Sequence, residues 1–272
     1  MHRPRAGAWH VIPRALFLAA MLVAAACSSV TLFVPPAGPG APAPEGEPAL
    51  AEAVERCRDI KTITAIMRLR GRLGDRRVPS VTLRGAATID GHVRLMLSAA
   101  GSTRFVVSGR AGTATVYLHD DNRTLTAPAE DIVEALIGMR ISPVRLLRVL
   151  AGCITMDPTF RSADRLGDFM RVRTADAQLV LVSADGRWRT IWGRFDELNV
   201  EYRAYENGAP MQVLLGTDQT HDPRVQLQLT IDERTVDDAL APEAFDYRPP
   251  PGAEPMTLEE LRQAGPLGSK KR

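Results

Sequence analysis

Cysteine and aromatic residues are scarce in this chain of 272 residues, which contains 3 Cys and is 5% aromatic. So few cysteines exclude the framework of a disulfide-dense small domain. Neither sign of charge prevails, since the formal net charge is +2, and 45% of the residues are hydrophobic. That balance excludes disorder throughout the chain, and the length allows one or two globular domains with a proper core.

Apolar runs of membrane-spanning length are also lacking. The run Ala15–Ala26 follows a basic head that contains Arg3, Arg5 and Arg14. As a helix it would reach only ~18 Å, well short of the ~30 Å hydrocarbon core of a bilayer. The pattern predicts a secretory signal peptide over 1–26, and the basic head disfavours the alternative of a buried N-terminal helix.

The end of this run, Val23–Ser29, resembles a bacterial lipobox, in which small residues precede a cysteine that becomes the acylated mature N-terminus. The resemblance implies lipidation of Cys27 and anchoring to a membrane, and Ser28 is similar to an outer-membrane sorting signal. A second letter match, Leu150–Cys153, lies far inside the chain with no basic head before it, so we expect no lipid there. The chain is thus expected in the bacterial outer membrane, facing the periplasm.

Cleavage before Cys27 changes the charge of the chain. The removed segment carries three Arg and no acid, so Lys+Arg falls from 34 to 31 against 32 Asp+Glu. The mature chain is then close to neutral, at −1. A chain without a basic field has no electrostatic footprint for nucleic acid, so we expect no nucleic-acid partner.

Proline, alanine and glycine dominate residues 27–48, which we interpret as a partly extended tether behind the lipidated cysteine. The folded domain is expected over 49–252. Residues 253–272 carry one short helical pattern, Thr257–Leu261, and are interpreted as a C-terminal tail.

Alternating apolar and polar residues recur through the predicted domain, most clearly over Val225–Asp232. Turn signals separate these runs, among them Gly74–Asp75, Asp185–Gly186 and Asn207–Gly208. The spacing predicts a meandering antiparallel sheet with one apolar face and one wetted face.

Helical spacing interrupts the alternation at three places. The first helix, over 50–60, precedes the strands, and two more lie within 129–151. Gly138 offers a break between these two, and Ser142 followed by Pro143 gives an N-cap with proline at the first helical position. Because apolar helix faces need apolar partners, the sequence predicts a mainly β fold of the α+β class: a curved antiparallel sheet with helices across its concave side.

Three segments resemble the LolB family of outer-membrane lipoprotein receptors and, equally, a related uncharacterised lipoprotein family, and a fourth is similar to the LolA family of soluble carriers. They are Met67–Leu73, Ala129–Gly138 and Ser142–Gly152, with Pro242–Pro250 similar to the close of LolA. The resemblance implies a half-open β-barrel lidded by helices, whose hydrophobic hollow holds acyl chains of lipoproteins or lipids. It also implies a periplasmic carrier protein as a partner.

This chain departs from the receptor family in its loops. That family has an apolar loop thought to touch the membrane, whereas the candidate loops Gly74–Arg77 and Ala99–Ser102 carry no large apolar tip. The sequence therefore favours lipid binding over insertion of cargo into a membrane.

Aliphatic side chains with freedom to repack suit the wall of a lipid cavity. The alternative interpretation of each such residue is that it fills a dry core. The candidates on the apolar face and helix stripes are Met67, Leu69, Leu83, Leu95, Leu97, Val107, Val116, Leu136, Leu147, Leu181, Leu227 and Leu229. Trp188 and Trp192, four residues apart, are expected on one face of a strand with Phe195 on the other. They are interpreted either as the cavity mouth or as packing under the lid.

An enzyme is not expected, and neither a metal nor a cofactor is predicted. His119–Asp121 and His221–Asp222 lie in turn-like segments without the spacing of a metal site. The chain has no G-x-S-x-G elbow and no phosphate-binding P-loop. Cys57 and Cys153 remain in an oxidising compartment, each in or just beyond a predicted helix, and they could form a disulfide that fastens the lid.

The sequence therefore predicts a membrane-anchored lipoprotein that binds acyl chains and assists lipoprotein or lipid transit to the outer membrane. The competing prediction is an envelope interaction or lipid-sensing lipoprotein that docks a protein partner without moving lipid.

Overall fold

The computed structural model describes residues 32–110, 112–217 and 225–267. The predicted signal peptide, Cys27 and the segment containing His221 and Asp222 lie outside these residues. Among the residues described, no helix is both long enough and apolar enough to cross a membrane.

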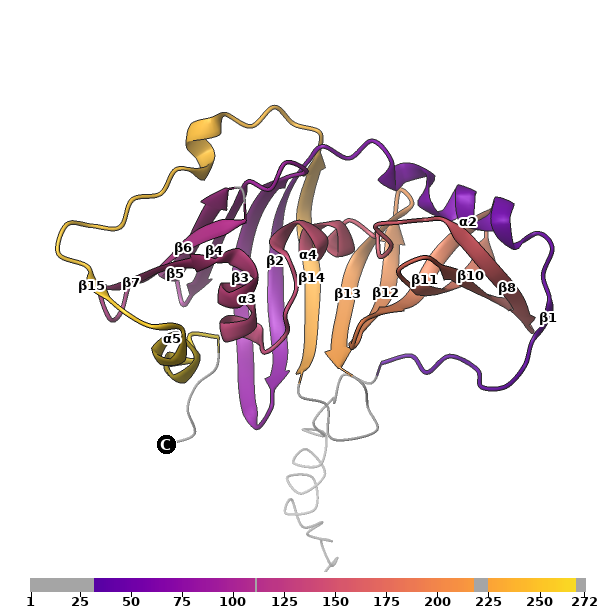
Figure 1. The fold of residues 1–272 in the computed structure, drawn as a ribbon, viewed down its shortest axis with the longest axis horizontal. Coiled ribbons are helices and arrows are strands. Elements are labelled where there is room, and N and C mark those ends of the chain that lie inside the picture. Colours follow the sequence, from indigo (N-terminus) through magenta and orange to yellow (C-terminus); the bar gives the residue numbers. More distant parts are fainter. Residues whose placement is uncertain (1–31, 111, 218–224, 268–272) are drawn as a thin grey trace, which may run out of the picture. The chain divides into compact units, whose positions relative to one another are not determined.

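One curved, unclosed sheet of fifteen strands forms the fold, in the order β1-β8-β9-β10-β11-β12-β13-β14-β2-β3-β4-β5-β6-β7-β15. Neighbouring strands pair antiparallel except β15, which is parallel to β7 (Figure 1). The strands are β1 (Ala41–Pro42), β2 (Thr62–Leu73), β3 (Arg76–Thr88), β4 (Val93–Ala99), β5 (Ser102–Arg110), β6 (Thr113–Leu118), β7 (Arg123–Pro128), β8 (Phe160–Leu166), β9 (Phe169–Thr174), β10 (Gln178–Ala184), β11 (Arg187–Phe195), β12 (Leu198–Glu206), β13 (Ala209–Thr217), β14 (Val225–Val236) and β15 (Glu254–Pro255). The prediction of a curved antiparallel sheet is confirmed, while its description as a half-barrel stays a prediction.

The first and last strand blocks of the chain meet at β14 and β2, two neighbouring strands of 12 residues each in the middle of the sheet. Val225 pairs with Leu73 at one end and Val236 with Ile63 at the other. Gly71 interrupts the register of β2 with a φ of +149°, and a Cβ there would lie 2.0 Å from the carbonyl oxygen of Gln226. Only glycine fits this approach of two backbones.

Three helices lie across one face of the sheet, as the sequence predicts (Figure 1). Helix α2 (Gly46–Val54), continued by the 3-10 turn Glu55–Cys57, packs on β8 to β11, α3 (Ala129–Ile137) on β6 and β7, and α4 (Pro143–Leu150) on β3. Both predicted signals are confirmed, because Gly138 ends α3 in the left-handed region and the Ser142 hydroxyl accepts the N–H of Arg145. The apolar core lies between these helices and the sheet.

The segments before and after the predicted domain pack against it, although the sequence predicts a tether and a tail. Within the predicted tether, β1 pairs with β8 at one edge of the sheet, and Leu32 and Ala43 are buried. Within the predicted tail, β15 pairs with β7 at the other edge, and α5 (Leu258–Ala264) contacts α3 with Leu261 fully buried. An open sheet edge exposes unpaired backbone groups, so covering both edges accounts for the difference. A second 3-10 turn, Pro242–Phe245, contacts β4 and β5.

Candidate functional site

An apolar pocket opens at the end of the sheet where β2 begins and β3 ends. Three segments form its walls: the entry to β2, the exit from β3, and one side of α4. The empty space in and around it is about 290 Å³, open solvent included. It is lined by Ile60, Lys61, Thr62, Ile63, Ala87, Thr88, Ile89, Val144, Leu147 and Arg148.

Backbone hydrogen bonds fix the mouth of this pocket. The N–H of Ile89 donates to the carbonyl oxygen of Lys61 at 2.8 Å, joining the two strand ends. Asp237 accepts the N–H of Lys61 at 2.7 Å and so holds the entry to β2. Ile89 itself is 54% exposed although it is a large aliphatic residue. It therefore presents an apolar surface at the rim of an apolar pocket.

Two cations, Lys61 and Arg148, complete the lining. Arg148 donates from Nη2 to the carbonyl oxygen of Cys57 at 3.1 Å, while its Nε is buried without a hydrogen-bond partner in the part of the chain described. Burial lowers the pKa of Arg148 from its ordinary value, although the guanidinium stays charged at neutral pH. The pocket thus combines aliphatic walls with positive charge.

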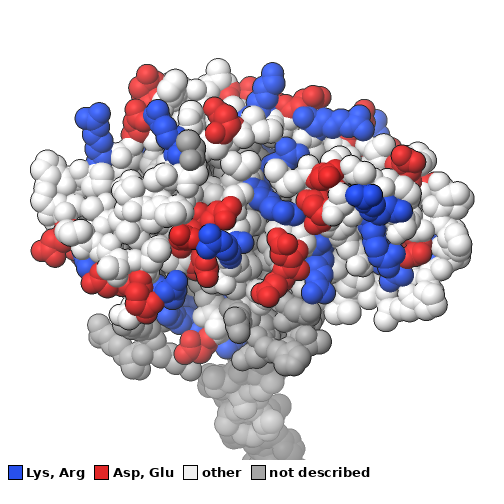
Figure 2. All heavy atoms as spheres, viewed as in Figure 1, with Lys and Arg blue, Asp and Glu red and all other residues white. Residues whose placement is uncertain are grey.

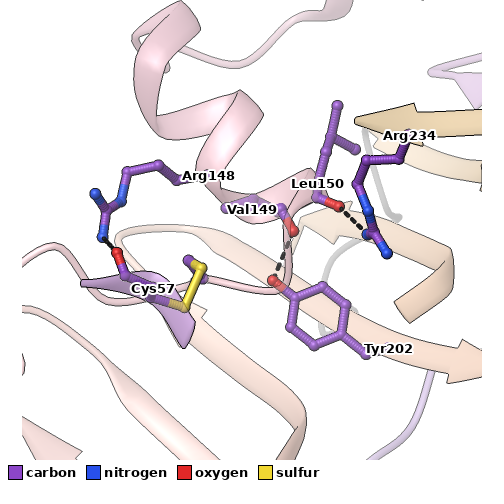
Figure 3. Close-up of a disulfide and its surroundings, with 7 residues drawn as sticks. Cys57, Arg148, Val149, Leu150, Tyr202 and Arg234 are labelled. Carbon is purple, nitrogen blue, oxygen red and sulfur yellow. Dashed lines mark hydrogen bonds between the residues drawn. A yellow bond between two sulfur atoms is a disulfide. The ribbon is translucent and has the colours of Figure 1, made fainter. Parts of the chain in front are cut away.

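The Cys57–Cys153 disulfide holds two walls of the pocket together (Figure 3). Cys57 ends the turn that leads into β2, and Cys153 follows α4. Two further hydrogen bonds tie the end of α4 to the sheet: the Tyr202 hydroxyl donates to the carbonyl oxygen of Val149 at 2.7 Å, and Arg234 donates to that of Leu150 at 3.5 Å. Burial raises the pKa of Tyr202 well above its usual range, so this donor keeps its proton.

Of the predicted cavity residues, Leu147 lines this pocket. Most of the others belong to the filled core, as the alternative interpretation has it. The residues in that core or packed against it are Met67, Leu69, Leu83, Leu95, Leu97, Val107, Val116, Leu136, Leu181, Trp188, Leu227 and Leu229. The space beneath the helices is therefore occupied largely by side chains, and the pocket lies at one end of it instead of along the whole concave face.

The prediction that Trp188 and Trp192 share a face is wrong. Leu181 pairs with Thr190 while Val180 pairs with Trp192, so β11 contains one extra residue opposite β10. A β-bulge of this kind reverses the alternation beyond it. Trp188 and Phe195 consequently face the core, whereas Trp192 lines a groove on the opposite face of the sheet. The Nε1 of Trp192 is buried without a hydrogen-bond partner among the described residues.

That groove has a wall that the sequence analysis missed. Leu32–Pro36, interpreted as tether, lies on the outer face of the sheet beside Trp192. Glu201 accepts the N–H of Phe33 at 2.6 Å, and the rings of Phe33 and Phe169 are 5.6 Å apart. The signal was present, since Leu32, Phe33 and Val34 form an apolar triplet in a segment otherwise rich in proline and glycine.

Within the described residues, the histidine candidate His119 belongs to no cluster of side chains that could hold a metal ion. The ring of His119 contacts Tyr117 at 4.7 Å, and Asp120 forms an ion pair with Arg104. No group of three or more His, Cys, Asp or Glu side chains in residues 32–110, 112–217 and 225–267 could hold a metal ion. On the face drawn in Figure 2, basic and acidic side chains are interspersed, without a broad field of one sign.

No protein-family model matches the sequence, and no curated protein matches it either. Among solved structures, a LolA superfamily protein from Nitrosomonas europaea superposes with a TM-score of 0.50 at 10% identity, covering 74% of this chain and 97% of that one. A putative outer membrane lipoprotein-sorting protein domain from Vibrio parahaemolyticus gives a TM-score of 0.47 at 11% identity, with the same coverage of 74% and 97%. The chain has the fold of the LolA/LolB-like superfamily.

Proposed function

We propose that this protein is a lipoprotein of the bacterial envelope, anchored through Cys27, that binds an acyl chain and assists the transit of lipids or lipoproteins to the outer membrane. The observation that carries the proposal is the pocket between β2, β3 and α4, which is aliphatic inside and cationic at two lining positions. The fold supports it, because the similar structure from Nitrosomonas europaea is a LolA superfamily protein. Such binding needs no catalytic group.

The size of the pocket limits what it takes. The volume of about 290 Å³ includes open solvent, so the enclosed space is well below the ~300–1,000 Å³ of small-molecule sites. It has room for at most the tip of one acyl chain and not for a bundle of several. Each methylene moved from water contributes ~0.8 kcal/mol before the losses of binding. Lys61 and Arg148 favour an acyl chain whose head, the end nearest the mouth of the pocket, carries an anionic group.

The test uses the mature chain with Cys27→Ser, so that no lipid of its own competes. Binding of a fluorescent fatty acid is measured with Ile89→Asp. Val34→Asp serves as the matched control, because Val34 is also an exposed aliphatic residue but lies on the opposite face of the sheet, away from this pocket. Losing the aliphatic side chain at the rim and adding a negative charge should weaken Kd about tenfold, equivalent to ~1.4 kcal/mol. Val34→Asp should leave Kd unchanged. Equal values for the two variants, or no saturable binding at all, would refute the proposal.

A second comparison addresses the charge at the mouth. Lys61→Ala should weaken binding of the fatty acid but not of its uncharged methyl ester. Equal weakening for both would show that Lys61 contributes through packing and not through charge. Should the chain bind neither compound and instead co-purify with an envelope protein, the interaction role would replace the proposed one.

A further inference from the structure

Leu32, the first residue that the structure describes, and the pocket lie at opposite ends of the central strands. Leu32, five residues after Cys27, is docked on β13, where a Cβ at Gly216 would lie 2.2 Å from its Cδ1. Leu32 is only 4% exposed. At most five residues along the chain therefore separate the predicted anchor from the docked Leu32, compared with the twenty or so of the predicted tether. An extended chain of five residues spans at most ~17 Å.

The docking point of Leu32 identifies which end of the sheet this short connection reaches. Gly216 pairs with Gln226 on β14, Gln226 pairs with Arg72 on β2, and Arg72 pairs with Arg77 on β3. Neighbouring strands are ~4.8 Å apart, so the β2–β3 hairpin lies within ~15 Å of Leu32 along the same row of the sheet. Figure 1 shows the β2–β3 hairpin, the end of β13 and the beginning of β14 at one end of the sheet.

The charge of this hairpin suits an anionic lipid surface. Arg72 and Arg77 are exposed and form no ion pair with any described residue, while Arg76 donates to the carbonyl oxygen of Arg262. Asp75 is the one acidic residue of the turn. Basic side chains held close to a bilayer are attracted to anionic headgroups within about a Debye length.

The acyl pocket lies at the other end of the same strands. Thr62 begins β2 and pairs with Thr88 at the end of β3, and both line the pocket. Strand β2 contains 12 residues, which places the pocket ~35 Å from the hairpin at ~3.3 Å per residue.

We infer that the β2–β3 hairpin end of the sheet rests on the anionic bilayer and that the acyl pocket opens away from that bilayer. The inference rests on the proposed function, since it assumes the anchor at Cys27. In this orientation a ligand reaches the pocket from the aqueous side. The pocket does not draw lipid directly out of the membrane that holds the anchor.

The experiment uses full-length, lipidated protein in vesicles of phosphatidylethanolamine and phosphatidylglycerol that carry a fluorescent acceptor on a headgroup. A donor dye is attached to Asp75→Cys or to Asp90→Cys. These matched positions are exposed turn aspartates at the two ends of β3. The disulfide keeps Cys57 and Cys153 from reacting with the dye. Energy transfer should be at least twice as efficient from position 75, and equal or reversed efficiencies would overturn the inference.

Releasing the short connection gives an independent readout. Leu32→Asp should free the docked segment and lower transfer from position 75, whereas Val34→Asp, in the same segment but 69% exposed, should not. Circular dichroism confirms that both variants are folded. If Leu32→Asp is folded and leaves transfer unchanged, the docked segment does not set the orientation.

The two proposals fail in different ways. A chain that does not float with vesicles has no anchor, which overturns the anchored function and the orientation together. A chain that floats but transfers energy equally from both positions overturns the orientation alone. Fatty-acid binding by the Cys27→Ser chain is measured without any membrane and does not depend on either result.

Discussion

Replacing Cys57 and Cys153 together with alanine should lower the free energy of unfolding by ~3–5 kcal/mol. The disulfide closes a loop with a sequence separation of 96 residues. In the chain-entropy account, a loop of about 100 residues contributes ~4.7 kcal/mol by restricting the unfolded chain. The hydrogen bonds from Arg148, Tyr202 and Arg234 remain in the variant and hold α4 near its place. The variant should therefore fold, since domains are commonly stable by ~5–15 kcal/mol.

Urea unfolding of the Cys27→Ser chain, oxidised and with both cysteines replaced, measures this difference. A thiol count on unreduced, unfolded protein accompanies it, and we expect no free thiol. Two free thiols would refute the disulfide. A loss below ~1 kcal/mol with an unchanged m-value would refute the entropic reasoning, because m reports how much surface is exposed on unfolding.

Three further changes test other parts of the structure. Tyr202→Phe removes the donor to the buried carbonyl of Val149 and should cost ~1–3 kcal/mol in urea unfolding, because that acceptor is left unsatisfied; a change near zero would contradict the hydrogen bond. Gly193→Ala would place a Cβ 2.6 Å from Cδ1 of Ile154, so overpacking should cost ~1–3 kcal/mol in the same assay, and no loss would mean that the neighbour moves freely. Hydrogen bonds, first from Arg123 and then from Thr257, lower the pKa of Glu260 to about 2. Since this pKa is depressed by folding, the stabilisation is complete above the unfolded value and is lost as the pH falls through about 2. An NMR titration of the carboxyl group checks it, and a midpoint near 4.5 would contradict the contacts.

Local patterns in the sequence determined most of the secondary structure. Alternation over Val225–Asp232 predicts β14, and Ser142 and Gly138 mark the start of α4 and the end of α3. These signals act through neighbouring residues, because strand alternation and helix capping are set within a few positions of the backbone. The apolar stripes on the helices also predicted that they cover one face of the sheet.

Tertiary structure alone decided where the site lies. The pocket combines residues near 60, 88 and 147, and no local pattern reports how close these segments come in space. One extra residue in β11 moves Trp192 to the outer face of the sheet. A residue of β11 is extra only in comparison with β10, and that comparison is set when the two strands pair. The packing of Leu32 and of the segments at both sheet edges has the same origin. A proline-rich or polar segment becomes ordered when it can pair with the free backbone groups of a sheet edge or bury a side chain against the finished sheet.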